Sequence, residues 1–268
     1  MKYTVLHIVL LFALITNAQD YKRTQNWYFG DSAGLSFATD PPTVLTDGAM
    51  NTIEGCATIS DTAGNLLFYT NGVKVWNKNH QIMDNGTGLK GHVSSTQSSL
   101  IVPYPENDSL FYIFTTDAVG QFNGLQYSLV NINKNGGLGS VIVKNILLHT
   151  PVCEKLTATY HLNGKDIWVI THGWGDNNFY AYQITKDTIL TCPVVSKAGS
   201  FHSGSVVNAQ GAIKFSSDGK QLASCVFNLF QSKVELFDFN TQNGSIIFSK
   251  KISNVVDPYS IEFSKNNR

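Results

Sequence analysis

Apolar and polar residues alternate in short runs along most of the chain, and one such run recurs five times. The fourth and sixth positions of each copy are mostly apolar, a period of two that predicts a half-buried strand. Each run then meets a turn rich in Gly, Asn, Asp or Pro. The copies are EGCATISDTAGN from Glu54, QSSLIVPYPEND from Gln97, EKLTATYHLNGK from Glu154, QGAIKFSSDGK from Gln210 and PYSIEFSKNNR from Pro258.

Further strand-like runs follow the turn in each of the first four copies. The second run reads LLFYT, LFYIFT, DIWVIT and QLASCVF, and the third reads VKVWN, LQYSLVNI, NFYAYQI and KVELFDF. A fourth run is clear only as VIVKNILL and SIIFSKKI, in the second and fourth units. Four short strands in each repeat predict an all-β fold, a β-propeller of the WD40-like kind. A two-sheet sandwich has no reason to restart one phrase five times.

The repeats predict an incomplete ring. NWYFGDSAGLSF, at residues 26–37, predicts one or two strands before the first full unit, and the fifth copy stops inside its turn at Arg268. We therefore expect four full blades plus partial ones, arranged as an open arc that is the front part of a larger propeller. A closed five-bladed ring made from these residues alone is the alternative, because a ring satisfies its first and last blades by closing.

Composition narrows the partners. The chain of 268 residues carries 19 basic and 19 acidic side chains, a balance that gives no pull toward nucleic acid. Lys2, the apolar run at residues 3–15 and the small residues up to Ala18 predict a signal peptide over residues 1–18. Residues 19–268 would then form one propeller domain, secreted and without a transmembrane segment.

The four cysteines have no spacing typical of a zinc site or a disulfide framework. Three of them lie in or beside apolar β-like runs, which favours buried free thiols. A bridge between Cys153 and Cys192 is the alternative in an oxidising compartment.

The first position of the repeat is the strongest polar feature. It holds Glu54, Gln97, Glu154 and Gln210 in the first four copies and Pro258 in the fifth. Because the first strand of a blade lies nearest the axis, these side chains are expected to form a ring at one end of the central channel. One hypothesis is a channel mouth that binds a ligand. The other is that the same side chains hydrogen-bond to neighbouring backbone and lock the blades together.

Other motifs add little chemistry. His172 and Trp174 are candidates for a ligand pocket, but an aromatic at a strand end also packs between blades. The glycine pattern at residues 86–91 precedes no helix, and the Asn-rich turn at residues 131–136 lacks the final glutamate of a calcium loop. We therefore predict no catalytic residues, no metal site and no cofactor.

Four long phrases resemble a known family. They are NWYFGDSAGLSF, EGCATISDTAGNLLFYTNGVKVWNKNHQIM, SSTQSSLIVPYP and EKLTATYHLNGKDIWVITHGWGDNNFYAYQIT. Together they resemble the amino-terminal propeller of surface proteins exported by the type IX secretion system of gliding bacteria, which often end in a gliding-motility-associated, type B sorting domain. The resemblance implies fold, export and a cell-surface place, and no reaction. Gly173 departs from the acidic residue expected in that family.

These observations lead to one functional hypothesis and two alternatives. We expect a non-enzymatic binding or scaffold module of an exported surface protein, whose partners are a surface glycan or protein and downstream modules of the same chain. One alternative is a propeller hydrolase, lactonase-like or glycan-cleaving, with its site in the channel mouth. The other is a spacer that only separates further modules.

Overall fold

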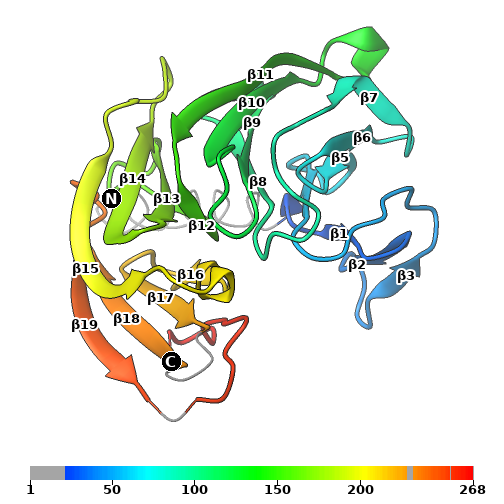
Figure 1. Cartoon of the computed structure of the whole chain (residues 1–268). Helices are drawn as coiled ribbons and strands as arrows, with labels where there is room; N and C mark the ends of the chain where they lie inside the picture. Colours follow the sequence, from blue (N-terminus) through cyan, green and yellow to red (C-terminus); the bar gives the residue numbers. More distant parts are fainter. Residues whose placement is uncertain (1–21, 228–231, 254, 268) are drawn as a thin grey trace, which may run out of the picture.

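The structure is a computed structural model, and it describes residues 22–227, 232–253 and 255–267. The predicted signal peptide lies outside the described residues. The described chain is nearly all β, with strands and two short 3₁₀ turns, η1 (Asn135–Gly137) and η2 (Val206–Ala209). Its sheets stand around a common axis (Figure 1), which confirms the predicted β-propeller.

The strands group into a first sheet of three and four blades of four. The first sheet contains β1 (Asn26–Phe29), β2 (Ala33–Ser36) and β3 (Thr43–Leu45). Blade 1 contains β4 (Ala57–Ser60), β5 (Leu66–Thr70), β6 (Lys74–Asn77) and β7 (Ile82–Thr87). Blade 2 contains β8 (Ser99–Tyr104), β9 (Asn107–Thr116), β10 (Leu125–Asn131) and β11 (Ser140–His149). Blade 3 contains β12 (Val152–Tyr160), β13 (Ile167–Gly173), β14 (Asp176–Ile184) and β15 (Val194–His202). Blade 4 contains β16 (Ile213–Phe215), β17 (Gln221–Val226), β18 (Lys233–Phe239) and β19 (Ile246–Ile252).

Within each blade the strands pair antiparallel in chain order, so that β4, β8, β12 and β16 each occupy one free edge. Blades 1 and 2 also touch at their outer strands, where Ser140 pairs with Asp84 in a single parallel bridge. The Ser140 hydroxyl donates to Asp84 Oδ2 at 2.7 Å. The outer strands of the first and third units, β7 and β15, are the two that the sequence shows only vaguely.

The core consists of apolar layers between neighbouring sheets. β13 shows how one strand serves two layers. Ile167 and Val169 belong to the cluster shared with blade 2, whereas Trp168 and Ile170 belong to the cluster shared with blade 4. Because successive side chains of a strand point to opposite faces, a run of apolar residues makes both faces of a blade apolar, and each face packs against a neighbouring blade. Two further clusters join blade 1 to blade 2 and to the first sheet.

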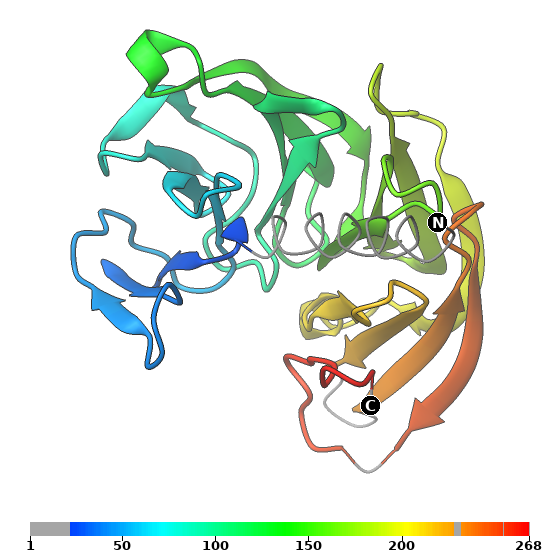
Figure 2. The same ribbon diagram turned by 180° about the vertical axis from the view of Figure 1, so that it is seen from behind.

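The described residues form an open arc and not a closed ring. Figures 1 and 2 show the sheets following one another around the axis from the first sheet to blade 4, with a gap between these two. The predicted arc is therefore confirmed, and the alternative of a closed five-bladed ring is not what these residues form. The first sheet has a third strand, β3, in addition to the one or two strands predicted over residues 26–37.

The prediction that the fifth copy of the repeat forms a strand is wrong. Residues 258–263 form no strand, although they run beside β16 as the next innermost strand would. The Ala212 N–H donates to the Tyr259 carbonyl at 2.9 Å, and Lys214 Nζ lies 2.9 Å from Glu262 Oε2. These contacts fix the segment without a hydrogen-bonded ladder, and a strand requires a ladder.

All four cysteines are unpaired, as expected. Cys153 and Cys225 are buried, while Cys56 is half-buried and Cys192 is exposed. The alternative bridge between Cys153 and Cys192 does not form. No helix in the described part of the chain has the length and apolar character needed to cross a membrane.

Candidate functional site

The free edges of β4, β8, β12 and β16 face the axis, and the predicted ring residues lie at the starts of these strands (Figure 1). The structure brings three of them, Glu54, Gln97 and Glu154, into one hydrogen-bonded group. Residues that the sequence did not single out complete this group. We call it the polar hub, and it consists of Glu54, Thr96, Gln97, Glu154, Lys155 and Tyr259.

Glu154 fastens blade 3 to blade 2. Its side chain is fully buried. The carboxylate accepts hydrogen bonds from the Thr96 N–H and hydroxyl, both at 2.7 Å, and from the Val119 N–H at 2.8 Å. Thr96 precedes β8 and Val119 follows β9, so both donors belong to blade 2. A buried carboxylate with three donors has its desolvation offset by charge-assisted bonds.

Lys155, the next residue of β12, fastens blade 3 to blade 4. It is also fully buried, because alternation along the strand sends it to the face opposite Glu154. Its ammonium donates to the carbonyls of Gln210 at 2.9 Å, Gly211 at 2.5 Å and Cys225 at 2.6 Å. All three N–H donors are thus used. Burial lowers the pKa of Lys155.

Glycine is required at position 211. Its φ of +92° is a backbone conformation that residues with a Cβ rarely adopt. An added Cβ would also lie 2.9 Å from the Cys225 carbonyl and 3.4 Å from Lys155 Nζ. Gly211 therefore lets the backbone approach the buried ammonium.

Gln97 crosses the axis. Its carboxamide oxygen accepts from the Leu156 N–H of β12 at 3.0 Å and from the Ile213 N–H of β16 at 2.9 Å. Its Nε2 donates to the Ile213 carbonyl at 3.0 Å. One side-chain amide therefore binds Ile213 through two hydrogen bonds, as a neighbouring strand would.

Glu54 joins the hub through Tyr259. The Tyr259 hydroxyl donates to Glu54 Oε2 at 2.6 Å, and the Ser94 hydroxyl donates to Glu54 Oε1 at 3.3 Å. Thr96 Oγ1, which binds Glu154, lies 3.0 Å from the Tyr259 hydroxyl oxygen. Burial, followed by the hydrogen bond to Glu54, raises the pKa of Tyr259. The Tyr259 and Thr96 hydroxyl groups thus lie next to each other, and each donates to one of the two predicted glutamates.

Gln210 and His172 do not join the hub through their side chains. Gln210 takes part through its backbone, as an acceptor for Lys155. His172 lies in β13, almost fully buried, with its ring 4.3 Å from that of His202 and 4.6 Å from that of Phe179. It packs inside blade 3, so the structure does not combine it with Glu54 and Glu154 in one pocket.

His172 is neutral at ordinary pH. Burial lowers the pKa of its imidazole to about 4, and Nδ1 lies 2.7 Å from the Gly173 carbonyl. Cys153 Sγ lies 3.9 Å from the same nitrogen, but burial raises the pKa of its thiol to about 12. The pair therefore lacks the thiolate and the solvent access that a nucleophilic cysteine requires.

The ring of first positions thus performs the locking role at Gln97 and Glu154. Its ligand-binding role stays a prediction. Among the described residues, no group of three or more His, Cys, Asp or Glu side chains is arranged to hold a metal ion.

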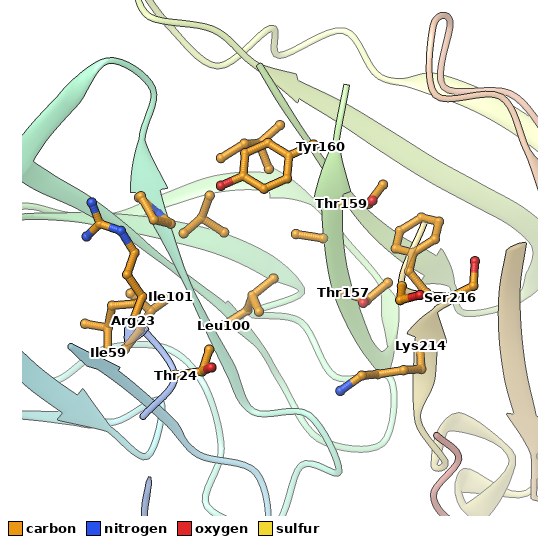
Figure 3. Close-up of a pocket in the computed structure, with 16 residues that line it drawn as sticks. Arg23, Thr24, Ile59, Leu100, Ile101, Thr157, Thr159, Tyr160, Lys214 and Ser216 are labelled. Carbon is orange, nitrogen blue, oxygen red and sulfur yellow. The ribbon is translucent and has the colours of Figure 1, made fainter. Parts of the chain in front are cut away.

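A cavity of about 400 Å³ begins where the hub ends, and it follows the innermost strands toward their carboxyl ends (Figure 3). Strands from all four blades contribute to its wall. The lining residues are Arg23, Thr24, Ile59, Leu100, Ile101, Val102, Pro103, Thr157, Ala158, Thr159, Tyr160, Ile167, Lys214, Phe215, Ser216 and Ser217. We call it the axial cavity.

The axial cavity is apolar with hydroxyl groups and two cations. Its charged lining residues, among those described, are Arg23 and Lys214, which lie on opposite walls (Figure 3). Arg23 Nη2 lies 2.7 Å from Asp108 Oδ1, and Lys214 Nζ lies 2.9 Å from Glu262 Oε2. Among the described residues that line the cavity, none carries a carboxylate, imidazole or thiol. Its volume is within the range typical of small-ligand sites.

Radial four-stranded blades with an axial cavity define a β-propeller. No protein-family profile and no curated protein sequence matches this chain. Similar solved structures include a putative 6-phosphogluconolactonase from Bacteroides fragilis, at 14% identity and a TM-score of 0.47, covering 88% of this chain and 67% of that one. Another is Kluyveromyces lactis Hsv2, at 11% identity and a TM-score of 0.46, covering 92% of this chain and 67% of that one. Citrobacter koseri AztD matches at 12% identity and a TM-score of 0.40, over 91% of this chain and 59% of that one. At these values no activity carries over to this chain.

Proposed function

We propose that this propeller is a non-enzymatic binding or scaffold module of an exported cell-surface protein. The proposal rests on the different residues at the two ends of the propeller axis, the polar hub and the axial cavity. At the hub, the glutamates that a hydrolase would need are bonded to neighbouring blades. At the cavity, the described lining residues include hydroxyl groups but no carboxylate, imidazole or thiol that could activate them as a general base.

The resemblance to type IX-exported propellers and the predicted signal peptide support export. The module would present its axial cavity to a surface component, while the arc of blades connects to downstream modules of the same chain. Expression of residues 1–268 in a bacterium with an intact export machinery tests this. Mass spectrometry should find the mature protein beginning at Gln19, outside the cytoplasm. A product that keeps Met1 and stays in the cytoplasm would contradict export.

The alternative, a propeller hydrolase, is tested by turnover. The purified chain should hydrolyse neither simple lactones nor surface glycans above the rate of a buffer blank. Turnover that is lost in Glu54→Gln or Glu154→Gln, with folding intact by circular dichroism, would replace the binding proposal by the hydrolase.

A further inference from the structure

The side chain of Gln97 shows how an amide group is bound at the propeller axis. Its carboxamide accepts from Leu156 of β12 and pairs with both backbone groups of Ile213 in β16. The edges of two innermost strands are therefore close enough to share one planar amide. The question is whether the same edges continue to offer such groups beyond Gln97.

The register of the blades answers this for β12. In an antiparallel pair, residues alternate between those that bond the partner strand and those whose N–H and C=O point away. The Leu156 N–H points to the axis, whereas the His161 N–H bonds Asp166 on the β13 side. The register from Leu156 to Tyr160 is unbroken. Ala158 therefore directs its N–H and C=O toward the axis.

The same holds for β16. Both backbone groups of Ile213 point to the axis and bind Gln97, whereas the Ser216 N–H bonds the Gln221 carbonyl on the β17 side. Phe215, two residues after Ile213, consequently directs its N–H and C=O toward the axis. Ala158 and Phe215 both line the axial cavity. They lie two residues, or about 7 Å, further along their strands than Leu156 and Ile213. Ala158 and Phe215 therefore repeat the pair of residues that binds the Gln97 carboxamide.

We propose that the axial cavity binds a short carboxylate-bearing peptide, with one peptide amide held between Ala158 and Phe215 as the Gln97 carboxamide is held between Leu156 and Ile213. The inference rests on the proposed binding function and names its ligand class. The carboxylate would lie near Lys214, because the charged lining residues are both cations. Lys214 is available for exchange, since its partner Glu262 is two-thirds exposed.

A peptide fits better than a glycan for two reasons. Phe215 offers a donor and an acceptor in line, the arrangement that one peptide unit matches, as Gln97 does at Ile213. The apolar wall formed by Ile101, Val102 and Phe215 suits aliphatic side chains. Strand edges elsewhere recognise extended peptides through such main-chain bonds.

The probe is the peptide acetyl-Val-Val-Glu with a free carboxyl terminus, titrated into the full chain by calorimetry or by chemical-shift changes. Its three amide nitrogens are N-methylated one at a time. Methylation removes a donor and leaves the side chains unchanged. We expect dissociation constants below about 5 mM. At least one N-methyl position should weaken binding by about ten-fold or more, and another should change it by less than about two-fold.

The carboxylate is tested with Lys214→Met, against Lys220→Met as the matched control. Lys220 is exposed, lies in the turn after β16 and does not line the cavity. Lys214→Met should weaken the acid peptide by about three-fold to ten-fold and leave the binding of acetyl-Val-Val-Gln amide, which carries no carboxylate, unchanged. Lys220→Met should change neither.

Three results would overturn the peptide assignment. They are no binding of the probe up to about 5 mM, equal effects of all three N-methyl groups, and tighter binding of the N-acetylglucosamine trimer than of the peptide. None of these affects the proposed module itself, which fails only if hydrolysis is detected or export is not.

Discussion

The two ends of β12 differ in what their residues contact at the propeller axis. At its start, Glu154 and Lys155 are fully buried and each makes three hydrogen bonds to a neighbouring blade. Toward its end, the strand lines a cavity where the described charged residues, Arg23 and Lys214, form ion pairs with exposed partners. The same strand therefore holds the arc together at one end and leaves room for a ligand at the other.

The difference shows why charge alone does not mark a functional site. A buried charge whose hydrogen-bonding capacity is filled has little left to offer a ligand, and removing its partners is costly. A half-exposed charge contributes little to stability and can change partners. Substitutions at the two ends should therefore differ most in their effect on unfolding.

The largest effect is expected at Glu154. Glu154→Ala leaves the half-buried Thr96 and Val119 N–H groups without this acceptor, and it should lower the free energy of unfolding by about 3–5 kcal/mol. Urea denaturation of the purified chain measures this. The control is Glu262→Ala in the exposed pair with Lys214, expected to cost less than about 1 kcal/mol. Similar losses in both variants would erase the distinction between the two ends.

Acid should destabilise the folded protein through two buried histidines of blade 3, His172 and His202. The pKa of His172 falls from 6.5 in the unfolded chain to about 4 in the folded protein, and burial also lowers that of His202. The unfolded state therefore binds more protons between these pH values, so stability is lost as the pH falls from 6.5 to 4. His172 alone should account for about 3 kcal/mol.

Urea denaturation at pH 7.5 and at pH 4.5 measures the loss. His172→Leu should reduce the difference between the two pH values, and the exposed His92→Gln should leave it unchanged. An unchanged pH dependence in His172→Leu would place the acid sensitivity elsewhere.

A smaller loss is expected at Gln97. Gln97→Ala removes three hydrogen bonds across the axis and should lower the free energy of unfolding by about 2 kcal/mol. The matched control is the exposed Gln121→Ala, with a change below about 0.5 kcal/mol. If Gln97→Ala were as mild as its control, the amide-binding geometry at the axis would lose its energetic basis.

Much of the fold was predictable because blades repeat. Period-two runs and polar turns located the inner three strands of every full unit. The outer strands β7 and β15 were missed because they are partly exposed and carry polar residues, as in IMDNGT and VVSKAGSFH. β3 was missed because its three residues, Thr43–Leu45, are largely exposed and give no pattern.

The site was predictable only where side chains repeat. Aligning the copies found Glu54, Gln97 and Glu154, but not Lys155, whose acceptors are backbone carbonyls that leave no mark in a sequence. Thr96 and Glu154 meet across 58 positions. The sequence did not predict the axial cavity. Four consecutive residues of β8, Leu100–Pro103, line it along the edge of the strand, and the alternation of apolar and polar residues does not indicate which strand edge is free.

The smallest effect on stability is expected at Lys214. Its side chain is 46% exposed and its partner Glu262 is 66% exposed, so Lys214→Met should change the free energy of unfolding by less than about 1 kcal/mol. Thermal or urea unfolding checks this. A loss above about 2 kcal/mol, within the range typical of buried interactions, would mean that Lys214 helps to hold the arc together. The cavity end of the axis would then resemble the hub, and the contrast between the two ends of β12 would fail.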